Sequence, residues 1–376
     1  MLYFARLGDM IMLTALLNLL HRRYHRPCNV IGAGNWSSGV FLGNPDVARV
    51  WSFGRHFPFP LSLHWPAVRR ALRASHPGPI YICEHHYRQL PRIRRMLAWA
   101  GIDPARCVFM QERPETLNHA VDRLVHLGFQ TPAALVAADY PPPNTHAPWA
   151  PRLKVLNNDR IELDAWLRSR GWAGRPIIMV QPGNHRSMSR RRKRWRRLKT
   201  DDKAWPIERW VALLHKVKAR MPNALIMLRG SHEEVKMLEQ VRAATGLDSV
   251  VVAGVGLRQL FALCELAHSM ISVDTGPAHA AAALGLPLVV MHGAGAQRHW
   301  LPRSPSGSPV IGVGGPPESM RVDRITVETV FDAWCAVLAR MEAPPRRQLA
   351  TPLAFQADTA FPAAAGTPTL KGGARA

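Results

Sequence analysis

The sequence predicts an α/β protein built of two successive doubly wound units. Short apolar runs alternate with longer segments of helical period in both halves of the chain, as in a parallel sheet covered by helices on both faces. A length of 376 residues is comfortable for two domains. A hydrophobic content of 47% supplies enough apolar side chains for two cores, which excludes a largely disordered chain.

The first unit begins with a short apolar strand over residues 2–5, a turn at Gly8-Asp9 and a helix that ends near Arg23. The same alternation predicts strands and one helix further on, at residues 47–51, 80–83, 87–100 (the helix) and 107–110. A proline-rich turn then precedes a helix over 159–171 that would connect the two units. We therefore place the first domain at residues 1–158 and the linker at 159–175.

The second unit alternates more clearly. Strands are expected at 176–180, 224–228, 250–252, 270–273 and 288–291, and helices at 206–221, 233–244, 257–267 and 277–284. In the first of these helices, apolar residues recur at i, i+3, i+4 and i+7 from Trp210 and so share one face. A final amphipathic helix over 326–341 completes a domain that we place at 176–341. Residues 342–376 are rich in Pro, Ala, Gly and Thr, which predicts a disordered tail.

The charge of the chain indicates an anionic partner. Lys and Arg number 49 against 26 Asp and Glu, a formal net charge of +23. Such a charge favours nucleic acid, phosphorylated substrates or an acidic membrane surface, and does not choose among them. Five scattered cysteines without C-x-x-C spacing argue against a disulfide framework or a zinc site and fit a reducing compartment. The longest early apolar run, residues 10–20, is about half of what a transmembrane helix needs, so we expect a cytoplasmic protein.

The strongest local motif is Asp274-Thr275-Gly276-Pro277-Ala-His279, which follows an apolar strand and opens a helix. A proline in the first turn loses no hydrogen bond, because the first amides of a helix have no partner within it. Those amides and the positive helix end form an anion site suited to a diphosphate, at the carboxyl edge of a parallel sheet where ligands bind. The alternative is an ordinary strand-to-helix connection, with Asp274 as a cap and His279 in the core.

Two further segments carry charged residues at strand ends. In Lys203-Ala-Trp205-Pro206, the lysine could neutralise a phosphate in the same crevice as Asp274, or could be an ordinary solvated lysine. In Gly8-Asp9, the carboxylate follows the first strand and could serve as a general base between the two halves. Asp9 could equally cap the helix that follows it, and both roles can hold together.

In order and separation, these three segments resemble the lipopolysaccharide heptosyltransferases of glycosyltransferase family 9. The resemblance covers most of the second half, roughly residues 177–338, and in the first half it is sharp around 6–20. It implies a GT-B fold, in which two Rossmann-like domains face each other across a cleft. The donor, usually ADP-L-glycero-β-D-manno-heptose, would bind the second domain and the acceptor the first. The resemblance also implies no cofactor and no catalytic metal, and no D-x-D pair lies near a predicted sugar site.

The resemblance assigns roles residue by residue. It makes Asp9 the base, Lys203 the diphosphate-binding lysine and Asp274 the residue that contacts the donor sugar. The residues that it places around the nucleotide and its phosphates are Thr200, Glu233 (with Glu234 as its rival on the ribose), Val255 near the adenine, Thr275, Gly276 and His279. The sequence Glu84-His85-His86 could coordinate a metal, but a turn with surface histidines accounts for it better.

A basic insertion at residues 186–199 departs from the family pattern, since nine of its fourteen residues are Arg or Lys. Seven of its charges surround Trp195: Arg190, Arg191, Arg192, Lys193, Arg194, Arg196 and Arg197. It could bind nucleic acid, contact an anionic membrane or the acceptor, or be a solvated loop. We favour the membrane or acceptor role and expect no nucleic-acid partner.

Together these features predict an inverting transferase that moves heptose from ADP-heptose to a lipopolysaccharide core acceptor. The enzyme would be cytoplasmic and peripheral on the inner membrane, with the nucleotide sugar, the glycolipid and the anionic inner leaflet as its partners. Two alternatives stay open: the same fold with another nucleotide sugar, or a nucleic-acid-binding protein that uses the basic insertion.

Overall fold

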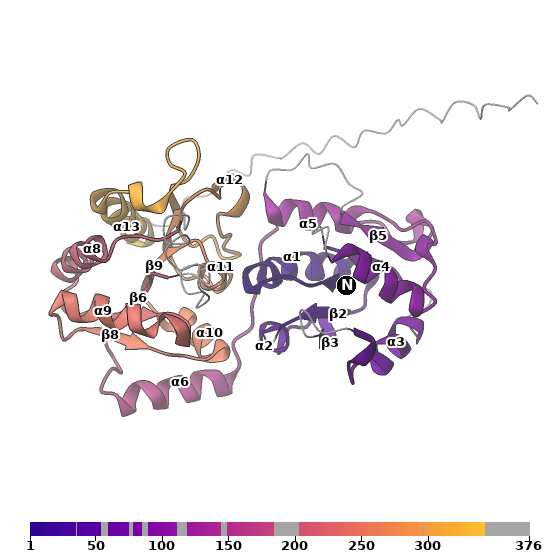
Figure 1. Cartoon of the computed structure of the whole chain (residues 1–376), viewed down its shortest axis with the longest axis horizontal. Coiled ribbons are helices and arrows are strands. Elements are labelled where there is room, and N and C mark those ends of the chain that lie inside the picture. Colours follow the sequence, from indigo (N-terminus) through magenta and orange to yellow (C-terminus); the bar gives the residue numbers. More distant parts are fainter. Residues whose placement is uncertain are drawn as a thin grey trace, which may run out of the picture.

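The computed structural model describes two α/β domains that lie side by side (Figure 1). Its described residues are 1–34, 36–53, 59–74, 78–84, 89–110, 119–143, 149–183, 203–295 and 297–342. The predicted basic insertion at 186–199, Thr200 and the tail beyond residue 342 lie outside these ranges. None of the described helices has the length and apolar character needed to cross a bilayer.

The first domain is built on a parallel sheet of order β3-β2-β1-β4-β5. Its strands are β1 (Leu2–Tyr3), β2 (Cys28–Ala33), β3 (Val47–Phe53), β4 (Ile80–Ile82) and β5 (Cys107–Phe109). Its helices are α1 (Leu7–Tyr24), α2 (Ser37–Phe41), α3 (Trp65–Ala74), α4 (Leu90–Trp99) and α5 (Ala120–Phe129). Side chains alternate across a strand, so Leu2 packs with α3 and α4 on one face while Tyr3 packs with α1 and α5 on the other.

The second domain is built on a parallel sheet of order β11-β10-β9-β6-β7-β8. Its strands are β6 (Ile177–Gln181), β7 (Leu225–Arg229), β8 (Val250–Ala253), β9 (Ser269–Val273), β10 (Leu288–His292) and β11 (Val310–Gly314). Its helices are α8 (Ile207–Arg220), α9 (Val235–Thr245), α10 (Leu257–Leu266), α11 (Gly276–Ala283), α12 (Gln297–Trp300) and α13 (Val327–Glu342). Strands β6, β7, β9 and β10 are buried along their whole length, which explains their continuous apolar sequences.

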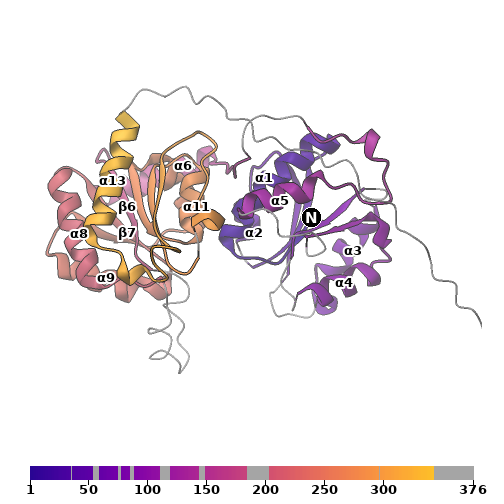
Figure 2. The ribbon, with the colours of Figure 1, turned by 90° about the horizontal axis from the view of Figure 1, so that it is seen from above.

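The two domains share one apolar core where they meet. Helices α8, α9 and α13 cover one face of the second sheet, and α10 and α11 cover the other. Side chains of α10 and α11 belong to the same buried cluster as those of α1 and α5. Figure 2 shows α11 lying between its own sheet and the helices of the first domain. The linker helix α6 (Asn157–Ser169) packs on α10 and so belongs to this junction.

Two local predictions are corrected by the structure. The predicted turn at Gly8-Asp9 is wrong, because α1 begins at Leu7 and both residues lie in its first turn. Helix α11 begins at Gly276, one residue before the predicted start, so Pro277 is its second residue. In both places the acidic or proline residue is favourable inside the first turn, where backbone amides lack partners within the helix.

Candidate functional site

The site is centred on an ion pair at the carboxyl edge of the second sheet. Asp274 follows β9, and its backbone amide donates to Met291 O of the neighbouring strand β10. Lys203 Nζ lies 2.6 Å from Asp274 Oδ2 and also donates to the Asp274 carbonyl oxygen at 3.0 Å. Both side chains are largely covered, with exposed fractions of 19% for Lys203 and 11% for Asp274. Residues 71 apart in sequence therefore form one partly buried charge pair.

The pKa of Asp274 shows which effect dominates at this pair. Burial acts to raise the pKa of the carboxyl, and the nearby charge of Lys203, together with His279 and His292, acts to lower it. The balance leaves the pKa of Asp274 below its usual value. The site thus holds a carboxylate next to an ammonium group at neutral pH.

The amino end of α11 lies beside this pair. Thr275 is extended and precedes the first helical residue, Gly276. Pro277 has no amide hydrogen, and the amides of Ala278 and His279 donate to Thr275 O at 3.1 and 3.4 Å, so the Gly276 amide and the positive end of the helix dipole are what this end offers to an anion. His279 Nε2 is 3.9 Å from Asp274 Oδ1, and burial lowers the pKa of His279 to about 4, so this imidazole is neutral at pH 7. Lys203 and the amide end of α11 together offer a place for a diphosphate.

The amino end of α1 meets that of α11 across the domain junction. A Cβ atom on Gly8 would lie 3.1 Å from His279 Cδ2, and one on Gly276 would lie 3.0 Å from Leu7 Cβ. Both distances are tighter than ordinary contacts, so the absence of side chains at Gly8 and Gly276 lets the two helix ends approach. The Gly8-Asp9 motif of the first domain and the Thr275-Gly276 motif of the second therefore share one location.

Asp9 combines the two roles that the sequence left open. It is the third residue of α1, and its Oδ2 accepts a hydrogen bond of 3.0 Å from the Arg6 backbone amide. This contact caps the helix. The side chain is partly exposed, so it is accessible from solvent beside the place where α1 meets α11.

The remaining predicted residues are distributed around the edge of the second sheet. Glu233 is exposed, whereas Glu234 is buried and accepts from the Ser231 amide at 2.5 Å. The other oxygen of Glu234 faces Gly183 at the end of β6, where a Cβ atom would collide with it. Val255 is half-buried in the connection between β8 and α10.

Sequence reasoning missed four residues at this site. His292 ends β10 and is fully buried beside Asp274, and burial lowers its pKa. A Cβ atom on Gly295 would lie 3.7 Å from Asp274 Oδ2 and 3.4 Å from Trp300 Cδ1. His119 reaches across from α5, and its Nε2 lies 2.9 Å from Leu301 O. The sequence His292-Gly-Ala-Gly295 repeats the pattern around Asp274, in which an apolar strand ends in a polar residue followed by a glycine-containing turn. No such pattern marks His119.

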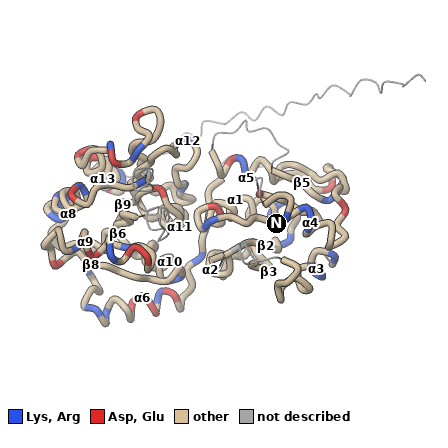
Figure 3. The backbone as a smooth tube through the Cα atoms, viewed as in Figure 1, with Lys and Arg blue, Asp and Glu red and all other residues tan. Residues whose placement is uncertain are grey.

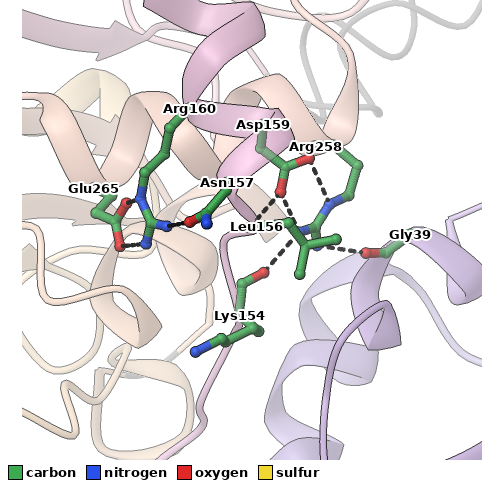
Figure 4. A network of polar contacts seen from close by, with 8 residues as sticks. All are labelled: Gly39, Lys154, Leu156, Asn157, Asp159, Arg160, Arg258 and Glu265. Atoms are coloured by element: carbon green, nitrogen blue, oxygen red, sulfur yellow. Dashed lines mark hydrogen bonds and ion pairs between the residues drawn. The ribbon is translucent and has the colours of Figure 1, made fainter.

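Polar contacts hold the domains together on either side of the site. Arg303 of the second domain pairs with both carboxylate oxygens of Asp122 on α5, at 2.5 and 2.7 Å. Arg258 at the start of α10 pairs with Asp159 of the linker and donates to Lys154 O and to Gly39 O of the first domain (Figure 4). A single guanidinium thus bridges both domains and the linker.

No group of three or more His, Cys, Asp or Glu side chains within the described ranges has the arrangement of a metal site. Glu84 is buried, and its neighbours His85 and His86 lie outside the described residues.

The family model for glycosyltransferase family 9 (heptosyltransferase) matches residues 108–314, more than half of the chain. The chain belongs to glycosyltransferase family 9. This membership confirms the predicted family and the prediction of a glycosyltransferase. No curated protein matches the chain.

Solved structures confirm the GT-B fold of this family 9 glycosyltransferase. The E. coli ADP-heptose lipopolysaccharide heptosyltransferase II is 19% identical, with a TM-score of 0.67 over 91% of this chain and 99% of that one. A family 9 glycosyl transferase from Veillonella parvula is 17% identical, with a TM-score of 0.66 over 90% and 96%. The E. coli heptosyltransferase WaaC with ADP is 18% identical, with a TM-score of 0.62 over 89% and 99%.

Proposed function

We propose that this enzyme transfers heptose from ADP-heptose to a lipopolysaccharide core acceptor, with inversion at the anomeric carbon. The observation that carries the proposal is the meeting of two helix ends, one next to Asp9 and the other next to the Lys203–Asp274 pair. The proposed base for the acceptor hydroxyl, Asp9, and the proposed diphosphate-binding group, Lys203, therefore both lie near the place where α1 meets α11. Similar solved structures include E. coli heptosyltransferases, one of them with ADP.

The donor diphosphate would lie at the amino end of α11 and against Lys203. As the bond between the anomeric carbon and the diphosphate oxygen breaks, negative charge grows on the departing ADP. The Lys203 ammonium, the Gly276 amide and the positive end of the α11 dipole would stabilise that charge. When the nucleotide sugar binds, an N–H group of Lys203 that donates to Asp274 would turn to the phosphate. Asp274 would then contact the sugar. Glu233 or Glu234 would hold the ribose, Val255 would pack near the adenine and Thr275 would contact a phosphate.

The acceptor hydroxyl would attack the anomeric carbon from the face opposite ADP. Asp9 would take the hydroxyl proton as the new carbon–oxygen bond forms, and a single displacement inverts the configuration. The Arg6 amide holds one oxygen of Asp9, which fixes the orientation of the carboxylate. In this mechanism protein groups supply the charge stabilisation and the proton transfer, and no cofactor or metal takes part.

The glycolipid acceptor would bring the enzyme to the membrane surface. We place the protein in the cytoplasm, peripheral to the inner membrane, with the basic insertion at 186–199 near anionic lipid or the phosphorylated acceptor. The charge of +23 supports that location, because cationic residues near an anionic leaflet contribute about 1 kcal/mol each.

The test compares donors with one acceptor. Purified enzyme is supplied with detergent-dispersed core acceptor and with ADP-heptose, ADP-hexoses, UDP-sugars or GDP-sugars, and nucleotide release and the anomeric configuration of the product are measured. We expect turnover with ADP-heptose and an inverted product. Turnover with a UDP-sugar or a GDP-sugar alone would show that the donor is not ADP-heptose. A product of retained configuration would exclude the single displacement.

A further inference from the structure

We propose that one corner of the first domain, formed by η1 (Phe59–Leu61), α3 and α4, docks on the surface of an anionic lipid bilayer. This inference rests on the proposed glycolipid acceptor and locates the membrane contact on a surface separate from the basic insertion at 186–199. Figures 1 and 2 both show α3 and α4 next to each other at the outer side of this domain, away from the second domain.

Large apolar side chains are exposed at this corner. Leu61 is 71% exposed, Leu63 is 96% exposed and Trp99 is 54% exposed. The ring of Phe59 joins them into one feature, because its centroid is 4.8 Å from that of Trp65 and 5.6 Å from that of Trp99. Exposed leucines scattered singly are ordinary, whereas leucines and a tryptophan around one aromatic cluster are typical of a binding surface.

The two helices at this corner carry cations and no acidic residue. Helices α3 and α4 contain Arg69, Arg70, Arg73, Arg92, Arg94 and Arg95, and the nearest exposed acid in the sequence is Asp103, four residues after Trp99. Arg69 and Arg70 are exposed on α3 and Arg95 is exposed on α4. Figure 3 shows the arginines of both helices in blue.

A hydrogen bond from a side chain to the backbone links the two helices. Arg73 Nε, on α3, donates to Ala100 O at the end of α4, with a distance of 3.0 Å. The cations of α3 and α4 therefore lie on two linked helices, one of which also carries Trp99.

Apolar side chains among cations fit an anionic bilayer by complementarity. Leucine and tryptophan enter the region between headgroups and acyl chains, and arginines remain at the level of the phosphates. Two other strongly exposed aliphatic side chains lack this setting. Ile161 on α6 and Leu266 on α10 are 66% and 58% exposed, but they adjoin the Arg160–Glu265 ion pair, which has both signs of charge.

The test measures binding to vesicles of phosphatidylethanolamine with phosphatidylglycerol at physiological salt. The first variant carries Leu61→Ser and Leu63→Ser, two side chains that are 71% and 96% exposed, so their removal should change the fold little. If half of each side chain enters the bilayer, each substitution lowers binding about tenfold, or about 100-fold together. Trp99→Ser should add a similar loss, and circular dichroism with thermal melting verifies its folding.

The matched control carries Ile161→Ser and Leu266→Ser and should bind vesicles like the unmodified enzyme. A second variant, Arg69→Gln with Arg70→Gln and Arg95→Gln, should bind weakly and with a shallower dependence on salt. All variants should retain transfer to a short soluble acceptor, because none alters a residue of the candidate site.

Three results would overturn the inference. The first is vesicle binding that is equal for the unmodified enzyme and the Leu61/Leu63 variant. The second is binding that is lost only when the insertion at 186–199 is neutralised. The third is a result in which this surface binds another protein and does not bind vesicles. Failure of transfer from ADP-heptose to the soluble acceptor would instead reject the proposed function, and it would leave the vesicle measurements unchanged.

Discussion

Replacing Lys203 by methionine should have two separable effects, one on stability and one on nucleotide binding. The substitution keeps an apolar stem and removes the ammonium group that lies 2.6 Å from Asp274 Oδ2. It leaves the carboxylate of Asp274 in a setting where 89% of its side chain is covered, since its exposed fraction is 11%. An unpaired buried charge is costly, because water no longer solvates it and no cation replaces the water.

The expected loss of stability is about 3 kcal/mol. Breaking a fully buried ion pair on one side costs about 3–5 kcal/mol, and we take the lower end because Lys203 keeps an exposed fraction of 19%. In a domain of this size each kcal/mol shifts Tm by about 2–4 °C, so the melting temperature of the second domain should fall by about 6–12 °C.

The pH dependence has a definite sign. In the unmodified enzyme the pKa of Asp274 is below its usual value, so the pair stabilises the fold at neutral pH and loses that contribution as acid protonates the carboxyl. In the Lys203→Met variant, burial should raise the pKa of Asp274 above its unfolded value. The difference in the free energy of unfolding between the unmodified enzyme and the variant should therefore be largest at neutral pH and should become smaller as the pH falls.

The assay combines thermal melting with calorimetric titration of ADP. Loss of a charged hydrogen bond should weaken ADP binding by about 1.5–3 kcal/mol. The double variant Lys203→Met with Asp274→Asn should recover most of the melting temperature, because no buried charge is left unpaired, but it should not recover ADP affinity. An unchanged ADP affinity in the single variant would remove Lys203 from the nucleotide site. An unchanged melting temperature would refute the argument from burial.

Three other substitutions test separate parts of the site. Asp9→Asn should lower kcat by about 10²–10⁴ while calorimetry shows unchanged ADP affinity, and near-normal turnover would exclude Asp9 as the base. His279 has its pKa lowered to about 4 by burial, so the unfolded chain binds a proton that the folded protein rejects between pH 6.5 and 4. As the pH falls over that range, His279 alone should lower the free energy of unfolding by about 3 kcal/mol, and His279→Gln should remove that part of the fall in urea titrations; an equally steep fall in the variant would contradict the assignment. Arg303→Ala removes the two contacts to Asp122, which are partly exposed and so contribute about 1 kcal/mol. Small-angle scattering should then report a more open arrangement of the domains, and an unchanged profile would show that this pair does not hold them.

The second domain follows from the sequence because its local signals agree. Its central strands are buried on both faces and form continuous apolar runs, and the turns after them contain glycine or proline. Strands β2, which lies inside the first sheet, and β11, at an edge of the second, were not predicted. β2 contains Asn29 and Gly32, and β11 contains Gly312 and Gly314, so neither has the unbroken apolar run that marks a central strand.

The site was predictable where a motif lies within one strand-to-helix turn. Asp274, Thr275 and Gly276 are adjacent in sequence, and their geometry follows from local rules. The contact between Lys203 and Asp274 spans 71 residues, so the sequence could place both at one sheet edge without showing that they pair. His119 depends on the approach of two domains, and no local pattern encodes that approach.

The two glycine motifs are coupled through backbone contact rather than through charge. Gly8 leaves room for His279, and Gly276 leaves room for Leu7, so each domain supplies one glycine and one side chain to the same junction. Because Asp9 follows Gly8 directly in α1, a rotation of the domains that separated these helix ends would also move the carboxylate away from α11. The position of the proposed base therefore depends on domain packing, and the buried cluster shared by α1 and α11 determines it as much as the sequence around Asp9 does.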